Sequence, residues 1–92
     1  MIHLTSKTPD IIQREIAERM RKRRKEFRYS QAELAKRSGV SLGSLKRFER
    51  EHEISLASLV KLSLALDCQD ELDGLFAKMH YRSIEEVIAD AQ

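Results

Sequence analysis

Residues 30–50 constrain the fold of this chain most, because their spacing predicts two short helices joined by a tight turn. Ser30 and Ser41 each precede a helical segment, and a serine hydroxyl in that position accepts hydrogen bonds from the free N–H groups of the first turn. Glu33 follows Ser30 at the spacing of a capping box. Gly39 lies between the segments, where glycine adopts the left-handed conformation that ends a helix at the least cost. We therefore expect two helices, over residues 31–37 and 42–51.

The side chains of these two segments divide into an apolar face and a basic face. The apolar residues recur at helical spacing, and Ala35 is small enough to let the second helix cross closely. The expected inner residues are Leu34, Ala35, Leu45 and Phe48. The expected outer residues of the second helix are Lys46, Arg47 and Arg50. A helix with such a basic outer face fits the major groove of DNA.

The charges of the chain are distributed unevenly along its length. The formal net charge is only +2, from 17 basic and 15 acidic residues. Residues 1–66 carry 15 of the basic and 8 of the acidic residues, which gives +7, whereas residues 67–92 carry 2 and 7, which gives −5. A basic N-terminal part followed by an acidic C-terminal part suits a protein that presents one basic face to phosphates.

Length and composition predict one all-α domain. Ninety-two residues can bury a single modest core but leave no room for a separate catalytic domain. The apolar residues fall at helical spacings, and three glycines, one proline and the lack of sustained alternation do not suggest strands. Cys68 is the only cysteine, which rules out an intrachain disulfide and fits a reducing compartment. Without a signal peptide or a membrane-length apolar run, we expect a cytoplasmic protein with no membrane contact.

The sequence offers no pattern typical of an enzyme. The three histidines, His3, His52 and His80, are scattered and lack metal-ligand spacing. The chain has neither a glycine-rich phosphate loop nor a nucleophile elbow. We therefore expect no catalytic residues, no cofactor and no metal site.

Caps and apolar stripes predict further helices. Thr8, Pro9 and Asp10 form a typical helix start, and that helix is expected to run to about Glu26. Its expected inner residues are Ile12, Ile16, Ala17, Met20 and Phe27. Ser55 is expected to cap a fourth helix with a stripe of Leu56, Leu59, Leu62, Ala65 and Leu66. Asp70 is expected to cap a fifth, with Leu72, Leu75 and Phe76 completing the core.

A short extra helix is predicted near the C-terminus. Ser83 and Glu86 have capping-box spacing, and an apolar stripe follows at Ile84, Val87, Ile88 and Ala91. A helix of about eight residues is not stable alone. It must pack on its own domain, on a second subunit or on another protein.

The chain resembles the phage repressor/Cro-type helix-turn-helix family, the xenobiotic-response-element type of transcriptional regulators. Three motifs carry the resemblance, namely Gln-Ala-Glu-Leu-Ala at 31–35, Gly-Val-Ser at 39–41 and Phe-Glu at 48–49. It extends over roughly residues 12–77. It implies a five-helix, lambda-repressor-like DNA-binding domain over residues 9–77, preceded by an N-terminal arm over 1–8 and followed by an extension over 78–92.

The resemblance also assigns roles to single residues. Base contacts are implied for Leu42, Gly43, Lys46 and Arg47. Phosphate contacts are implied for Ser30, Gln31, Ser41, Ser44 and Arg50. An ion pair between Arg24 and Glu49 is expected to hold the first and third helices together. Leu42 can touch a thymine methyl but cannot hydrogen-bond a base, and Gly43 has no side chain. Specific hydrogen bonding therefore falls to Lys46 and Arg47, whose usual partner is guanine.

A regulator of this type is expected to bind double-stranded DNA as a homodimer and to act as a repressor. A two-fold dimer would place its recognition helices ~34 Å apart on a palindromic operator. The sequence also resembles the HipB-like antitoxins, which accompany HipA-like kinase toxins. The alternative is therefore an interaction module that binds such a kinase partner, with DNA binding secondary or lost.

Overall fold

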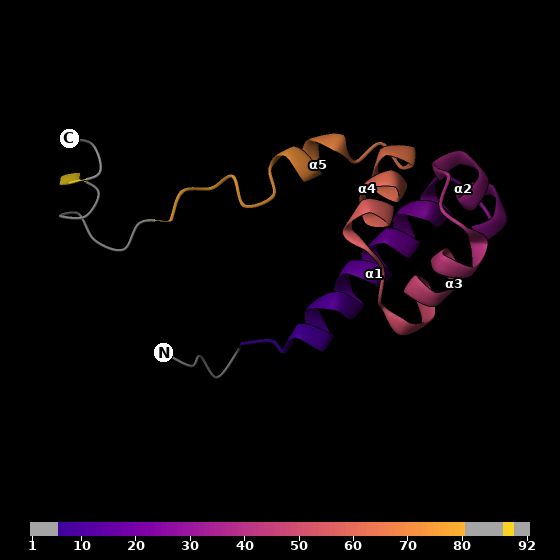
Figure 1. The fold of residues 1–92 in the computed structure, drawn as a ribbon, viewed down its shortest axis with the longest axis horizontal. Coiled ribbons are helices and arrows are strands. Elements are labelled where there is room, and N and C mark those ends of the chain that lie inside the picture. The colour runs from indigo at the N-terminus through magenta and orange to yellow at the C-terminus, as the bar shows by residue number, and fades with distance from the viewer. Residues whose placement is uncertain (1–5, 81–87, 90–92) are drawn as a thin grey trace.

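The computed structural model describes residues 6–80 and 88–89, and every regular element within them is a helix (Figure 1). The helices are α1 (Pro9–Glu26), α2 (Gln31–Ser38), α3 (Leu42–Glu51), α4 (Leu56–Ala65) and α5 (Gln69–Asp73). This confirms the predicted all-α fold class. The helix predicted near the C-terminus lies outside the described residues, apart from Ile88 and Ala89.

Side-chain caps set the starts of the first four helices. The Thr8 hydroxyl accepts a hydrogen bond from the Ile11 N–H at 3.3 Å, and the Ser30 hydroxyl accepts one from Glu33 at 3.0 Å. Ser41 and Ser55 each accept the N–H of the residue three positions later, both at 3.1 Å. These bonds satisfy amide donors that no helical carbonyl can reach, so the starts were predictable from the sequence.

Two details of capping differ from the prediction. The Glu33 carboxylate does not turn back to Ser30 but accepts a hydrogen bond from Arg37 Nε at 2.8 Å, because a cation one turn later offers it a charged partner. Asp70 lies inside α5 instead of capping it. The cap position belongs to Cys68, which makes no side-chain capping bond.

The core forms where α2 packs against α3 and α4, and where α1 packs against α3. Figure 1 shows these elements gathered together, with the N-terminal end of α1 extending beyond them. The buried apolar residues are Ala17, Leu34, Ala35, Val40, Leu45, Phe48, Leu62 and Leu66. The expected inner residues of α2 and α3 are therefore all buried.

Five residues predicted for the core are exposed instead. Ile12 lies at the free end of α1, Phe27 lies just past its last turn, and Leu56 is the first residue of α4. Leu75 and Phe76 follow the end of α5 at Asp73, and Phe76 is 93% exposed. The apolar spacing predicted that the fifth helix continues through these two residues and packs on the core. Instead α5 ends at Asp73, and the chain then leads away from the other helices (Figure 1).

The turn between α2 and α3 needs a glycine. Gly39 has φ +78°, which L side chains rarely adopt, although a Cβ there would meet no atom within 4 Å. We expect Gly39→Ala to lower the free energy of unfolding by about 1 kcal/mol, measured by urea denaturation. Gly43→Ala is the matched control, because Gly43 is helical and equally uncrowded. That variant should be at least as stable as the parent, and an equal loss in both would contradict the explanation from φ.

Candidate nucleic-acid interface

The turn at Gly39 places α3 across α2 with one face inward and the other in solvent. The Gly39 N–H donates to the Ala35 carbonyl at 3.0 Å and closes α2, and Ser41 then caps α3. Leu45 and Phe48 are buried on the inner face of α3. The residues for which the resemblance implied DNA contacts on α3 are all exposed, namely Leu42, Gly43, Ser44, Lys46, Arg47 and Arg50. The fold thus presents the predicted recognition surface to solvent.

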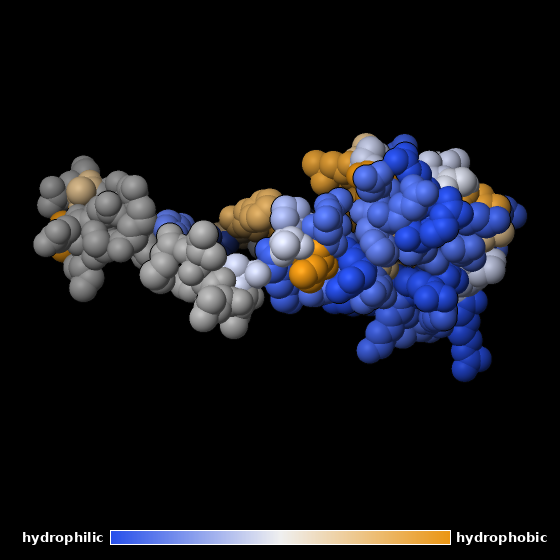
Figure 2. All heavy atoms as spheres, turned by 90° about the horizontal axis from the view of Figure 1, so that it is seen from below, coloured by the Kyte–Doolittle hydropathy of each residue, from blue (hydrophilic) through white to orange (hydrophobic). Residues whose placement is uncertain are grey.

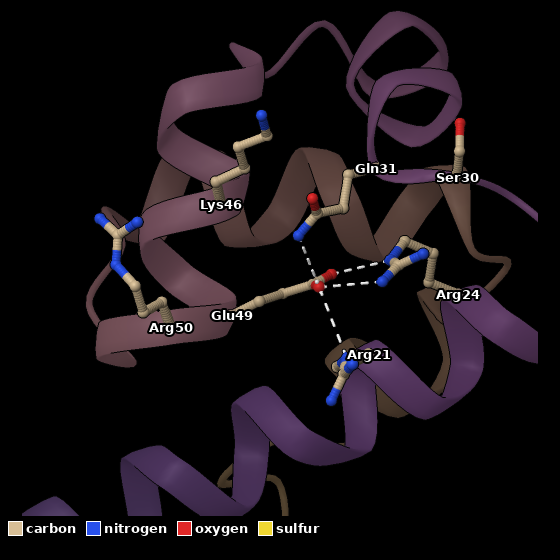
Figure 3. Close-up of a pocket in the computed structure, with 7 residues that line it drawn as sticks. All are labelled: Arg21, Arg24, Ser30, Gln31, Lys46, Glu49 and Arg50. Atoms are coloured by element: carbon tan, nitrogen blue, oxygen red, sulfur yellow. Dashed lines mark hydrogen bonds and ion pairs between the residues drawn. The ribbon is translucent and has the colours of Figure 1, made fainter.

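The structure brings together the predicted pair of Arg24 and Glu49. Arg24 Nε donates to Glu49 Oε2 at 2.8 Å and Arg24 Nη2 donates to Oε1 at 2.9 Å, while Nη1 donates to the Tyr29 carbonyl at 2.8 Å. The two side chains are only 9% and 7% exposed. Gln31 Nε2 also donates to Glu49 Oε1 at 2.9 Å, and Arg21 Nε lies 3.8 Å from the same oxygen (Figure 3). One carboxylate therefore joins α1, α2 and α3.

A basic pocket of about 570 Å³ opens beside this network, at the N-terminus of α2. Its lining residues are Arg21, Arg24, Ser30, Gln31, Lys46, Glu49 and Arg50. Figure 3 shows Lys46 and Arg50 projecting from α3 away from the Glu49 carboxylate. Four cationic side chains against one carboxylate leave the pocket positive, and the adjoining helix N-terminus favours an anion as well. The pocket is therefore suited chemically to a phosphate group.

The predicted phosphate contacts fall into two groups. Ser30, Gln31 and Arg50 line the basic pocket, although one amide N–H of Gln31 already serves Glu49. Ser41 and Ser44 lie together at the start of α3, where the Ser41 hydroxyl donates to the Ser44 hydroxyl at 2.8 Å. Apart from Arg50, which is in the last turn of α3, the residues of each group lie at a helix N-terminus, so both groups can offer donors to a backbone phosphate.

Arg47 lies apart from the basic pocket, on the side of α3 that faces the start of α4. Its Nε donates to Glu51 Oε2 at 2.9 Å, and its Nη2 donates to Glu53 Oε2. The hydrogen bond with Glu51, together with the charge of Glu53, raises the pKa of Arg47. The same bond holds the pKa of the Glu51 carboxyl below its usual value. Neither carboxylate was predicted as a partner of Arg47, although the i,i+4 spacing of Arg47 and Glu51 is a signal for such a pair.

The helical part of the chain has a largely polar face. Figure 2, seen from below the view of Figure 1, shows a helical body that is mostly hydrophilic on that face, with small apolar patches. Within the described residues, no three histidine, cysteine or acidic side chains gather closely enough to hold a metal ion. None of the helices described here is both long and apolar enough to cross a membrane.

A capped helix, a left-handed glycine turn and a second helix with an exposed basic face define a helix-turn-helix domain. The helix-turn-helix family model matches residues 20–72, which is more than half of the chain. The chain therefore belongs to this family, the xenobiotic-response-element type of DNA-binding transcription regulators. No curated protein and no solved structure matches the chain significantly.

Proposed function

We propose that this chain is a cytoplasmic, sequence-specific repressor of transcription that binds a palindromic operator as a homodimer. The observation that carries the proposal is the exposed basic face of α3 beside the N-terminus of α2. Lys46 and Arg50 on that face line the basic pocket, where a backbone phosphate fits by charge. A phosphate held there would set the depth and direction of α3 in the major groove.

Recognition of the base sequence then depends on few residues of α3. Arg47 is 59% exposed on the outer side of α3, and its guanidinium can offer two N–H groups to guanine O6 and N7. Lys46 supplies a second cation for a guanine or a phosphate. Leu42, which is 36% exposed in the first turn, offers an apolar contact for a thymine methyl. Gly43 adds no side-chain contact.

So few base contacts per protomer favour a dimer. Two recognition helices related by a two-fold axis double the contacts and require half-sites ~34 Å apart. The chain offers exposed apolar side chains for such an interface at Leu75, Phe76 and Met79, after α5. We assign the dimer contact to this segment.

A salt titration tests the proposal. A pool of random duplexes would be selected for binding, and the affinity for the selected duplex compared with that for a shuffled duplex between about 50 and 200 mM salt. A steep fall of log K with log salt and a large specific-to-nonspecific ratio are expected. Weak binding without sequence preference would contradict the proposal.

A second candidate function is binding to a partner protein, as in an antitoxin that holds a kinase toxin. The apolar first turn of α3 favours it, because Leu42 and Gly43 provide no hydrogen bond to a base. In that case the chain would bind its partner tightly while binding DNA weakly and without sequence preference. The same titration therefore separates the two candidates.

A further inference from the structure

The guanidinium of Arg47 is held by two carboxylates on the surface proposed to meet DNA. Its Nε donates to Glu51 Oε2 at 2.9 Å, within α3, and its Nη2 donates to Glu53 in the loop that follows. Arg50 Nη2 also lies 3.5 Å from Glu51 Oε1. Glu51 and Glu53 thus balance the charge of Arg47, and Glu51 also lies near Arg50, which lines the basic pocket. The three other cations of that pocket, Arg21, Arg24 and Lys46, still outnumber the Glu49 carboxylate.

The backbone fixes the position of Glu53. His52 ends α3 with φ 68°, and its N–H donates to the Phe48 carbonyl at 2.8 Å. This left-handed residue turns the chain back, so that the next residue lies beside Arg47. The His52 carbonyl in turn accepts a hydrogen bond from Gln13 Nε2 at 3.3 Å, which links the loop to α1. The loop that carries Glu53 is therefore anchored at both the helix end and a neighbouring helix.

The two pairs leave part of the guanidinium free. Arginine has five N–H donors, and the pairs with Glu51 and Glu53 use the Nε–H and one N–H of Nη2. One N–H on Nη2 and two on Nη1 remain, which suffices for a bidentate contact with guanine O6 and N7. Arg47 can therefore read guanine while both carboxylates keep it in place. A nonspecific contact with phosphates gains little from it, because its charge is already balanced.

Resting on the proposed function, we infer that Glu51 and Glu53 are specificity-determining residues. They hold the Arg47 guanidinium in an orientation in which its free N–H groups can reach the edge of a base. They also balance its positive charge, so that Arg47 adds little to the attraction between the protein and the DNA phosphates. Sequence-independent binding depends on net positive charge, whereas base recognition depends on the direction of the N–H groups. The carboxylates therefore lower nonspecific affinity more than specific affinity.

The test compares Glu53→Gln with Glu26→Gln in the full chain. Both substitutions remove one exposed negative charge. Glu26 is the control because it lies on α1 and pairs with Arg23, whose guanidinium also bonds Glu71 of α5, so it does not touch Arg47. Affinities would be measured on the selected duplex and on its shuffled version. We expect Glu53→Gln to raise the affinity for the shuffled duplex about fivefold and that for the selected duplex less than twofold. Glu26→Gln should change neither by as much as twofold.

The outcomes separate this inference from the proposed function. An equal gain on both duplexes, or no gain on the shuffled one, overturns the inference while the proposed function stands. A parent protein that binds both duplexes equally overturns the proposed function, and the inference with it. Glu53 is an exposed loop residue, so an unchanged melting temperature is expected and would exclude a folding defect as the cause.

Discussion

Replacing Glu49 by alanine is expected to lower the free energy of unfolding by about 3–5 kcal/mol, because it leaves a buried cation without its partner. The Arg24 guanidinium is held by both oxygens of Glu49 at 2.8 and 2.9 Å, with side chains only 9% and 7% exposed. The Gln31 amide would lose its acceptor as well. A small domain has little stability to lose, so urea denaturation should show Glu49→Ala largely unfolded near room temperature.

The double variant Arg24→Met, Glu49→Leu is the control for this prediction. Removing both charges leaves no uncompensated ion, and apolar residues of similar volume often replace a buried pair with little loss. The double variant should therefore be markedly more stable than Glu49→Ala. If the single variant unfolds at the same urea concentration as the parent, the pair does not hold the helices together.

Removing the two cations of α3 that line the basic pocket is expected to weaken DNA binding strongly and to change its dependence on salt. Each phosphate contact contributes about 0.9 to the slope of log K against log salt. The variant Lys46→Ala, Arg50→Ala should therefore show a slope that is shallower by about 1.8 per protomer, with the largest loss of affinity at low salt. Fluorescence anisotropy on a labelled duplex across a salt series measures both quantities.

The matched control for the pocket variant is Lys7→Ala, Lys61→Ala, which removes two exposed lysines, one before α1 and one on α4. It makes the same change in net charge away from the recognition helix. Its slope should stay within about 0.3 of the parent value, since it removes no phosphate contact. Equal slopes for the two double variants would mean that the basic pocket does not bind the backbone.

Local chemistry made much of the fold predictable. Thr8, Ser30, Ser41 and Ser55 were identified as caps from the sequence, and each accepts the expected amide hydrogen bond. Gly39 was identified as the turn residue and has a positive φ. These features depend on neighbours within one turn of the chain. Short-range spacing therefore gave the bounds of α1 and α3 and the start of α4, and it placed the end of α2 within one residue.

Features that depend on distant partners were harder to predict. Leu75 and Phe76 have apolar spacing, but α5 ends before them and no described element covers them. The pairing of Arg47 with Glu53 needs the left-handed turn at His52. The sequence did not predict this turn, because residues other than glycine adopt a positive φ only in a small minority of cases. The Arg24–Glu49 pair was expected only through the family resemblance, since the two residues lie far apart in the sequence.

Affinities of the parent and of Arg47→Ala for a selected duplex and for its shuffled version test most directly whether α3 reads bases through its basic side chains. The parent should prefer the selected duplex, and Arg47→Ala should lose about 5- to 150-fold of affinity for it. Binding of the variant to the shuffled duplex should fall by a smaller factor, because only the charge that balances Glu51 and Glu53 is lost there, whereas the selected duplex also loses a contact with guanine. Equal binding of both proteins to both duplexes would contradict the claim.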